Sequence, residues 1–248
     1  MKKLDVLVFA AHPDDAELCC GGTIAKLVQQ GKSVGIIDMT RGEMGTRGTP
    51  EQRMDESQKA SAVLKLSVRE NLQLPDTQLD NIPEYRQKII RAIRAYRPHI
   101  CLVGAPSDRH PDHGNGTRLA LDAIFYSGLA KITTTDNYGN NQERWRPSHI
   151  LHYMQDRPFT PDLVLDITET FEVKKEAILA FNTQFNVSDP GDEPETYISG
   201  QDFFKGIEAR ARHYGRMIGV VYGEPFKYYN GPLPLNSFNM FFETNPFR

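Results

Sequence analysis

Two short segments of this chain concentrate the side chains that could do chemistry. They read HPDDAEL, beginning at His12, and SDRHPDHG, about a hundred residues later. His12, Asp15 and His113 supply two imidazoles and one carboxylate, a set that holds zinc in catalytic sites and leaves a fourth position open for water. Asp14 then remains as a second acid beside the metal, where it can take a proton from that water.

The second segment contributes another candidate pair, His110 and Asp112. An imidazole oriented by a carboxylate can act as an acid or stabilise an oxyanion. Either segment alone could be a turn or a helix cap. A catalytic site is favoured because both segments follow strands that we expect to be neighbours.

Short apolar runs and amphipathic stretches predict the elements that position these residues. Strands are expected at 4–10, 33–40, 70–74, 99–104, 150–154 and 163–167, and helices at 14–30, 50–66, 83–96, 115–129, 170–181 and 201–218. Alternating strands and helices indicate a parallel sheet with helical crossovers. In a doubly wound sheet of order 3-2-1-4 the first and fourth strands are adjacent, so the two segments meet at the switch point where ligands bind.

We therefore predict an α/β fold: one domain over 1–248, with a Rossmann-like, mostly parallel sheet flanked by helices. Residues 1–130 would form the core with the metal site, and 131–248 a sheet extension, a long loop and a C-terminal helix. The loop at 182–200 lacks periodicity, which is typical of lids and binding loops. Gly21 and Gly22 are expected to let the first helix pack closely against the sheet.

Composition excludes several classes of protein. The 248 residues carry a net charge of −3, with 39% hydrophobic and 25% charged residues, as in ordinary globular domains. Three cysteines cannot build a disulfide framework and fit a reducing cytosol. Without a basic stripe or an apolar run of membrane length, we expect a soluble cytoplasmic protein with neither nucleic acid nor membrane as partner.

Nucleotide binding is the other common use of the turn after a first strand. The chain has no GxGxxG motif there, and two aspartates at the start of the helix would repel a phosphate. Two histidines and a carboxylate also form the facial triad of non-haem iron oxygenases, but the α/β pattern and the additional base Asp14 favour hydrolysis. A non-catalytic sugar- or metal-binding protein is a third interpretation, which the additional acid–base groups disfavour.

The stretch AHPDDAELCCGGT, followed far downstream by HPDH, resembles the PIG-L/LmbE-like family of metal-dependent N-acetylglucosaminide deacetylases. The resemblance implies Zn²⁺ bound by His12, Asp15 and His113, although such sites also accept other divalent metals. It implies Asp14 as the general base. His110 would stabilise the tetrahedral intermediate or protonate the leaving amine, with Asp112 behind it.

The loop TRGEMGTRGTPEQR resembles the branch of that family that deacetylates N-acetyl-α-D-glucosaminyl L-malate in bacillithiol biosynthesis. This resemblance implies a small amino-sugar substrate, with another N-acetyl amino sugar conjugate as the alternative. Arg53 would contact the substrate, Arg109 is a second candidate, and Tyr197 would contribute to the oxyanion site. The two arginines could instead be solvated surface charges. The family also implies a homo-oligomer, commonly a hexamer.

Overall fold

The computed structural model describes residues 3–185, 194 and 196–233. Within these residues the strands are β1 (Val6–Ala10), β2 (Val34–Asp38), β3 (Val68–Asn71), β4 (Ile100–Val103), β5 (His149–Tyr153), β6 (Leu163–Asp166) and β7 (Gly223–Tyr228). They form one sheet of order β3-β2-β1-β4-β5-β7-β6. The predicted order 3-2-1-4 and the α/β fold class are confirmed. The pairs from β3 to β5 are parallel, whereas β7 is antiparallel to both of its neighbours.

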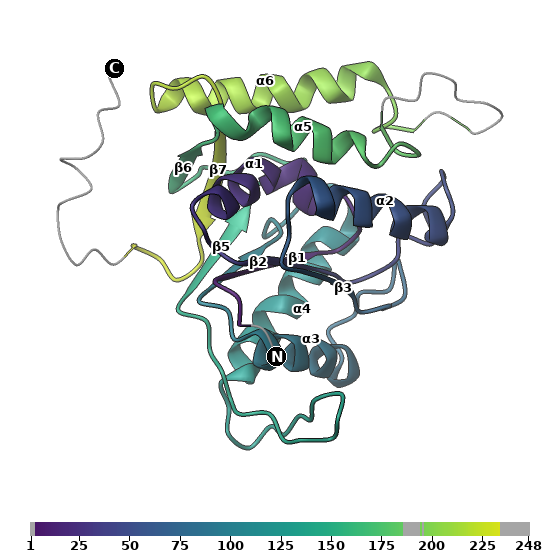
Figure 1. Ribbon diagram of the computed structural model, residues 1–248, viewed down its shortest axis with the longest axis vertical. Coiled ribbons are helices and arrows are strands. Elements are labelled where there is room, and N and C mark those ends of the chain that lie inside the picture. Colours follow the sequence, from purple (N-terminus) through teal and green to yellow (C-terminus); the bar gives the residue numbers. More distant parts are fainter. Residues whose placement is uncertain (1–2, 186–193, 195, 234–248) are drawn as a thin grey trace.

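Helices cover both faces of the sheet (Figure 1). They are α1 (Asp15–Gln29), α2 (Pro50–Val63), α3 (Pro83–Tyr96), α4 (Pro111–Ser127), α5 (Phe171–Leu179) and α6 (Gln201–Met217), with a short 3-10 turn, η1 (Thr168–Thr170), before α5. In Figure 1, α3 and α4 lie on one face and α1 and α2 on the other, with α5 and α6 stacked outside them.

The alternation of side chains along β1 builds two cores. Leu7 and Phe9 are buried in the cluster that contains Ile93 of α3, whereas Val6 and Val8 belong to the cluster on the α1 side. Successive side chains of a strand point to opposite faces, so both faces of β1 are covered. Because each fully buried side chain of this size stabilises the fold by about 1.5–3 kcal/mol, β1 is anchored firmly beneath the residues that follow it.

The helix α1 is kinked, and a buried carboxylate binds backbone N–H groups next to the kink. Cys20 departs from helical geometry (φ −139°, ψ 20°). Glu224 of β7 accepts hydrogen bonds from the backbone N–H groups of Gly22 (3.0 Å) and Thr23 (2.7 Å), and pairs with buried Lys174 of α5 (2.6 Å). The carboxylate thereby satisfies amide groups near the kink.

The packing expected for the two glycines of α1 is wrong. Gly21 faces Lys174 of α5, and a Cβ on Gly22 would lie 2.7 Å from Ile167, the residue before η1. The two glycines therefore allow α5 and the start of η1, rather than the sheet, to pack closely against α1.

β7 was not predicted from the sequence, and several element boundaries differ from those predicted. β3 begins at Val68 rather than at residue 70, and α4 begins at Pro111 rather than at residue 115. Pro225 lies within β7 and argues against a central strand because it lacks an N–H. It pairs with Val164 of β6, but the pairing of β5 with β7 ends at Phe226, so Pro225 faces no β5 partner.

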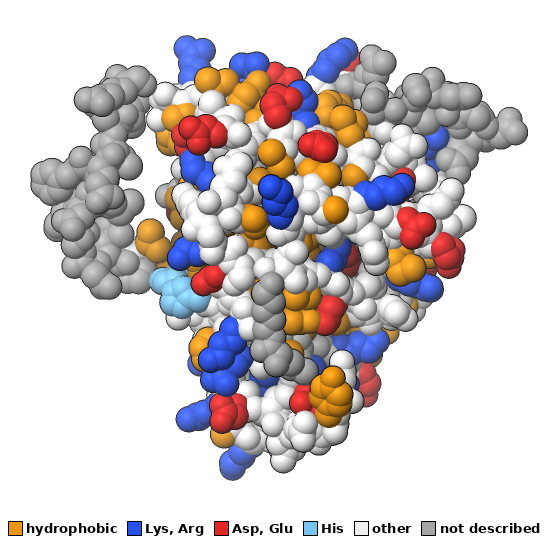
Figure 2. Space-filling view, in the orientation of Figure 1, with side chains coloured by type: hydrophobic (Ala, Val, Ile, Leu, Met, Phe, Trp, Pro, Cys, Tyr) orange, Lys and Arg blue, Asp and Glu red, His pale blue; other side chains and the backbone are white. Residues whose placement is uncertain are grey.

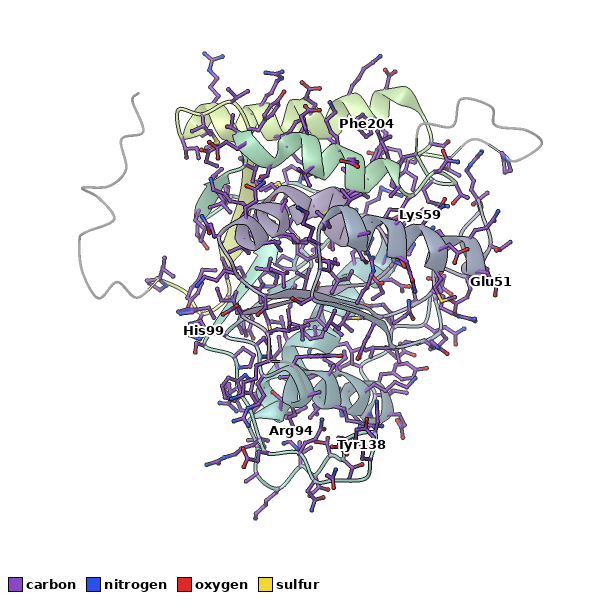
Figure 3. The ribbon with its side chains drawn as sticks, in the orientation of Figure 1. Glu51, Lys59, Arg94, His99, Tyr138 and Phe204 are labelled. Atoms are coloured by element: carbon purple, nitrogen blue, oxygen red, sulfur yellow. The ribbon has the colours of Figure 1, made fainter. Side chains whose placement is uncertain are left out.

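The outer layer is tied to the domain by aromatic packing. One buried cluster joins Ala60 of α2, Ile207 of α6, and the two phenylalanines that follow α5, Phe181 and Phe185. Phe204 of α6, which is labelled in Figure 3, packs against this cluster. On the face shown in Figure 2, positive and negative side chains are interspersed. No helix of the described residues is long and apolar enough to cross a bilayer.

Candidate active site

The two segments rich in histidine and aspartate meet at one edge of the sheet. His12 follows β1 and His110 follows β4, and these strands are parallel neighbours, with Val6 opposite Ile100. The first segment continues into α1 and the second into α4. A cavity of about 760 Å³ opens there, and eight of the nine residues predicted for the site are among its lining: His12, Asp14, Asp15, Arg53, Arg109, His110, His113 and Tyr197. The ninth, Asp112, is buried and does not line the cavity.

Asp15 lies between the two histidines that were predicted to share a metal with it. Its Oδ1 is 3.2 Å from Nε2 of His113, and its Oδ2 is 3.6 Å from Nδ1 of His12. Burial alone would raise the pKa of Asp15, but the neighbouring His113 and His12 outweigh it and hold the pKa well below its usual range. The structure brings this trio together, and its role as the ligand set stays a prediction.

The pKa values of the two imidazoles are shifted in the opposite direction, upward. Burial disfavours the charged ring of His113, yet Asp15 and Asp108 raise its pKa to about 9. For His12 burial is again outweighed, by hydrogen bonds to Asp112, Asp15 and Asp76, and its pKa is raised well above normal. The carboxylates therefore favour positive charge at this place.

His110 completes a cluster of three histidines. One ring nitrogen from each of His12, His110 and His113 lies within 4.8 Å of the others. Nδ1 of His110 accepts a hydrogen bond from the backbone N–H of Asp112 (3.2 Å). Burial, and then the two other histidines, lower the pKa of His110. A neutral ring that accepts at Nδ1 carries its proton at Nε2, where it can donate to a substrate oxygen.

The expected pairing of His110 with the carboxylate of Asp112 is wrong. The carboxylate accepts a hydrogen bond from the backbone N–H of Thr77 (2.8 Å) and lies 3.4 Å from Nε2 of His12. The physical reason is that α4 begins at Pro111, so the backbone N–H of Asp112, rather than its side chain, is directed at His110.

Asp76 is a site residue that was not predicted from the sequence. Its Oδ1 is 3.1 Å from Nε2 of His12, and its Oδ2 accepts from the backbone N–H of Met44 (2.9 Å). With His12 and Asp112 it forms a second group whose ligand atoms lie within 4.8 Å of one another. The available signal was its place after β3, at the same edge of the sheet as the other site residues.

Asp14 combines burial, strain and a shifted pKa. Its backbone has φ 115° and ψ −28°, a conformation that only a few per cent of non-glycine residues adopt, and its side chain makes no helix cap. Burial raises its pKa to about 7, although the positive charge of Arg53 opposes the rise. The interpretation of Asp14 as a cap is therefore wrong, and a carboxylate poised to exchange a proton near neutral pH fits the geometry.

Arg53 is not a solvated surface charge. It is 5% exposed, and its Nη2 donates to Oδ2 of Asp14 (3.0 Å) and to the carbonyl of Pro13 (2.6 Å). Gly42 (φ 66°) lies against the guanidinium, where a Cβ would come within 3.3 Å of it. Arg53 is thus committed to the Asp14 carboxylate.

Arg109 and Tyr197 lie together at the mouth of the cavity. The guanidinium of Arg109 pairs with Asp156 and stacks 4.4 Å from the centre of the Tyr197 ring. The Tyr197 hydroxyl donates to Asp156 (3.2 Å), and the residue is 61% exposed. Residues 186–193 and 195 of the loop predicted at 182–200 lie outside the described residues, so its role as a lid or binding loop stays a prediction.

The chain has relatives of named activity. The family model described as "PIG-L: GlcNAc-PI de-N-acetylase" matches residues 7–124. Diacetylchitobiose deacetylase of Thermococcus kodakarensis is 28% identical over 91% of this chain and 83% of its own length. A 1D-myo-inositol 2-acetamido-2-deoxy-alpha-D-glucopyranoside deacetylase of Saccharomonospora viridis is 24% identical over 73% of this chain and 85% of its own.

Among solved structures, the conserved protein TT1542 of Thermus thermophilus is 38% identical and superposes with a TM-score of 0.81, covering 94% of this chain and 97% of that one. The chain belongs to the PIG-L family. It is a hydrolase of the N-deacetylase class, which sets aside the oxygenase and the non-catalytic interpretations. The bacillithiol branch is a finer statement than these relatives support.

The side chains of this PIG-L site fit a divalent metal. Asp15 offers both oxygens to flanking imidazoles, and the raised pKa values of His12 and His113 show that the site favours cationic charge. Two imidazoles and a carboxylate are ligands that zinc accepts. His12, Asp15 and His113 would hold the metal, and when bound it would polarise a carbonyl and acidify a water.

Asp108, the second residue missed by the sequence analysis, orients one of these ligands. Its Oδ2 accepts from Nδ1 of His113, so that Nε2 faces Asp15, and its Oδ1 accepts from the backbone N–H of Arg157 (2.6 Å). Partners of this kind fix the tautomer of a metal-binding histidine. Asp108→Asn is expected to weaken metal binding about 10- to 100-fold in competition with a chelating dye. An unchanged affinity would show that His113 needs no such partner.

The pairing of Arg53 with Asp14 predicts a pH effect. Asp14 must be ionised to accept a proton, so activity falls as the pH drops through its pKa. Arg53→Met removes the charge that lowers this pKa, so the acidic limb of kcat/KM is expected to move to higher pH, with about a tenfold or larger loss at the acidic end. Arg53→Lys, which keeps the charge, is the matched control. A uniform loss at every pH in Arg53→Met would contradict the electrostatic role.

Proposed function

We propose that this chain is a zinc-dependent hydrolase that removes the N-acetyl group from an N-acetylglucosaminide. Asp14 carries the proposal, as a buried carboxylate with its pKa raised to about 7 beside Asp15 and the three-histidine cluster. The two named relatives support the substrate class, since both act on acetamido sugars and differ in what is attached to the sugar.

Asp14 is placed to move the proton that amide hydrolysis requires. Asp14 lines the cavity; one of its oxygens is held by Arg53, and the other has no hydrogen-bond partner among the described residues. That free oxygen accepts a proton from the attacking water. Since Asp14 is buried next to a positive charge, it can hold this proton and return it near neutral pH.

His110 is placed to serve the substrate carbonyl. Its Nε2–H is directed away from α4, because Nδ1 is occupied by the backbone N–H of Asp112. When water adds to the amide carbon, negative charge develops on the carbonyl oxygen, and this N–H donates to it. The C–N bond then breaks, the water oxygen stays with acetate, and the amine leaves with the proton held by Asp14.

For the substrate we propose N-acetyl-α-D-glucosaminyl L-malate, which is deacetylated in bacillithiol biosynthesis. The resemblance of the loop at 40–53 supports this choice, as does the presence of Arg210 in the lining of the cavity. The alternative is another conjugate of an N-acetyl amino sugar.

Acetate release from a panel of N-acetylglucosaminides tests the proposal. The panel holds the malate conjugate, its dimethyl ester, N,N'-diacetylchitobiose and an inositol conjugate, each at equal concentration with the metal-loaded protein. We expect acetate and free amine in a 1:1 ratio, fastest with the malate conjugate. Release from chitobiose alone would contradict the malate assignment, and release from none would contradict deacetylation of this substrate class.

A further inference from the structure

The cavity is bordered by three arginines, and their partners differ. Arg53 pairs with Asp14, and Arg109 pairs with Asp156. Arg210 of α6 donates to the backbone carbonyl of Gln155, and no carboxylate of the described residues lies within 4.0 Å of its guanidinium. Within the part of the chain that the structure describes, Arg210 is therefore the cavity arginine without a carboxylate partner.

Arg210 lies close to the reacting end of the cavity. The side-chain amide of Gln155, the residue whose carbonyl Arg210 contacts, is 3.4 Å from Oδ1 of Asp15. The guanidinium also acts electrostatically on Cys19, which lies one helical turn beyond Asp15 in α1. An anionic substituent attached to a sugar at the metal site is thus within the reach of this side chain.

One stripe of α6 forms the wall that carries Arg210. Phe203, Gly206, Ile207 and Arg210 all border the cavity, and their spacing is that of a single helix face. A Cβ at Gly206 would meet nothing within 4 Å, so this position leaves open space beside Arg210. Glycine inside a helix costs about 0.5–1 kcal/mol relative to alanine, and here it keeps room for a ligand.

We propose that Arg210 determines specificity by binding an anionic group, a carboxylate, on the aglycone of the substrate, in the space left by Gly206. The inference rests on the proposed deacetylase function, and it assigns the contact with the aglycone to Arg210 rather than to Arg53, which pairs with Asp14. A guanidinium binds a carboxylate through two parallel hydrogen bonds. One charged hydrogen bond of this kind corresponds to about 10- to 150-fold in binding.

The test compares the malate conjugate with its uncharged dimethyl ester in wild type, Arg210→Ala and Arg210→Lys. In Arg210→Ala we expect kcat/KM for the diacid to fall about 10- to 150-fold, mainly through KM, and kcat/KM for the ester to change by at most about threefold. Arg210→Lys should recover part of the lost kcat/KM for the diacid. Rising salt concentration should lower kcat/KM for the diacid in wild type and in Arg210→Lys, but not in Arg210→Ala. The matched control is Arg212→Ala, since Arg212 is an exposed arginine of the same helix. This substitution should leave kcat/KM unchanged for both substrates.

Equal losses on diacid and ester would overturn the proposal, because Arg210 would then only brace Gln155. Calorimetric binding of L-malate to the metal-loaded protein separates this result from a failure of the proposed function. Weaker malate binding by Arg210→Ala supports the anion site even if no acetate is released. Equal binding by both proteins overturns it, whatever the enzyme deacetylates.

Discussion

Asp14→Asn is expected to lower kcat by about a hundredfold or more while the protein keeps its metal. Asparagine has nearly the same shape, tolerates positive φ better than most residues, and can still accept a hydrogen bond from Arg53. It cannot take up a proton from water. The ligands predicted for the metal, His12, Asp15 and His113, are unchanged, so binding and catalysis should separate.

The test measures both kcat and the metal content of each preparation, for wild type and for Asp14→Asn. Asp55→Asn removes an exposed carboxylate from α2, two residues from Arg53, and should behave as wild type. Turnover of Asp14→Asn close to that of wild type would show that another group takes the proton.

His113→Ala is expected to lose stoichiometric metal and to lower kcat/KM by about a thousandfold or more, since a bound metal contributes several kcal/mol to such reactions. The substitution removes the imidazole that faces Asp15 and leaves Asp108 without its partner. Thermal unfolding should remain cooperative, which distinguishes metal loss from loss of the fold.

Metal content after gel filtration checks this prediction. The matched control is His99→Ala, because His99, which is labelled in Figure 3, is exposed and directly precedes β4, whereas the site residues follow the other end of that strand. It should retain the metal and full activity. One tightly bound metal ion in His113→Ala would remove His113 from the ligand set.

The fold core and the place of the site could be predicted from sequence because they depend on local patterns. The apolar run of β1 and the alternation of strands and helices determine which strand ends are adjacent, and adjacency brings His12 to His113. β7 could not be predicted, because Pro225 argues against a strand until its β5 side is known to be unpaired.

Side-chain partners were the part that sequence could not specify. Asp112 is close to His110 in sequence, yet its carboxylate turns to His12 and Thr77 because the start of α4 directs the backbone instead. Asp76 comes from a loop whose path no periodicity determines. The contact of Arg53 with Asp14 depends on how α2 is placed, which is a tertiary property.

Metal-dependent deacetylation is tested most directly by acetate release from the preferred N-acetylglucosaminide before and after chelation. We expect acetate and free amine to appear in equal amounts, a chelator to abolish their release, and one equivalent of Zn²⁺ per chain to restore it. Undiminished release from protein shown to be free of metal would contradict the account.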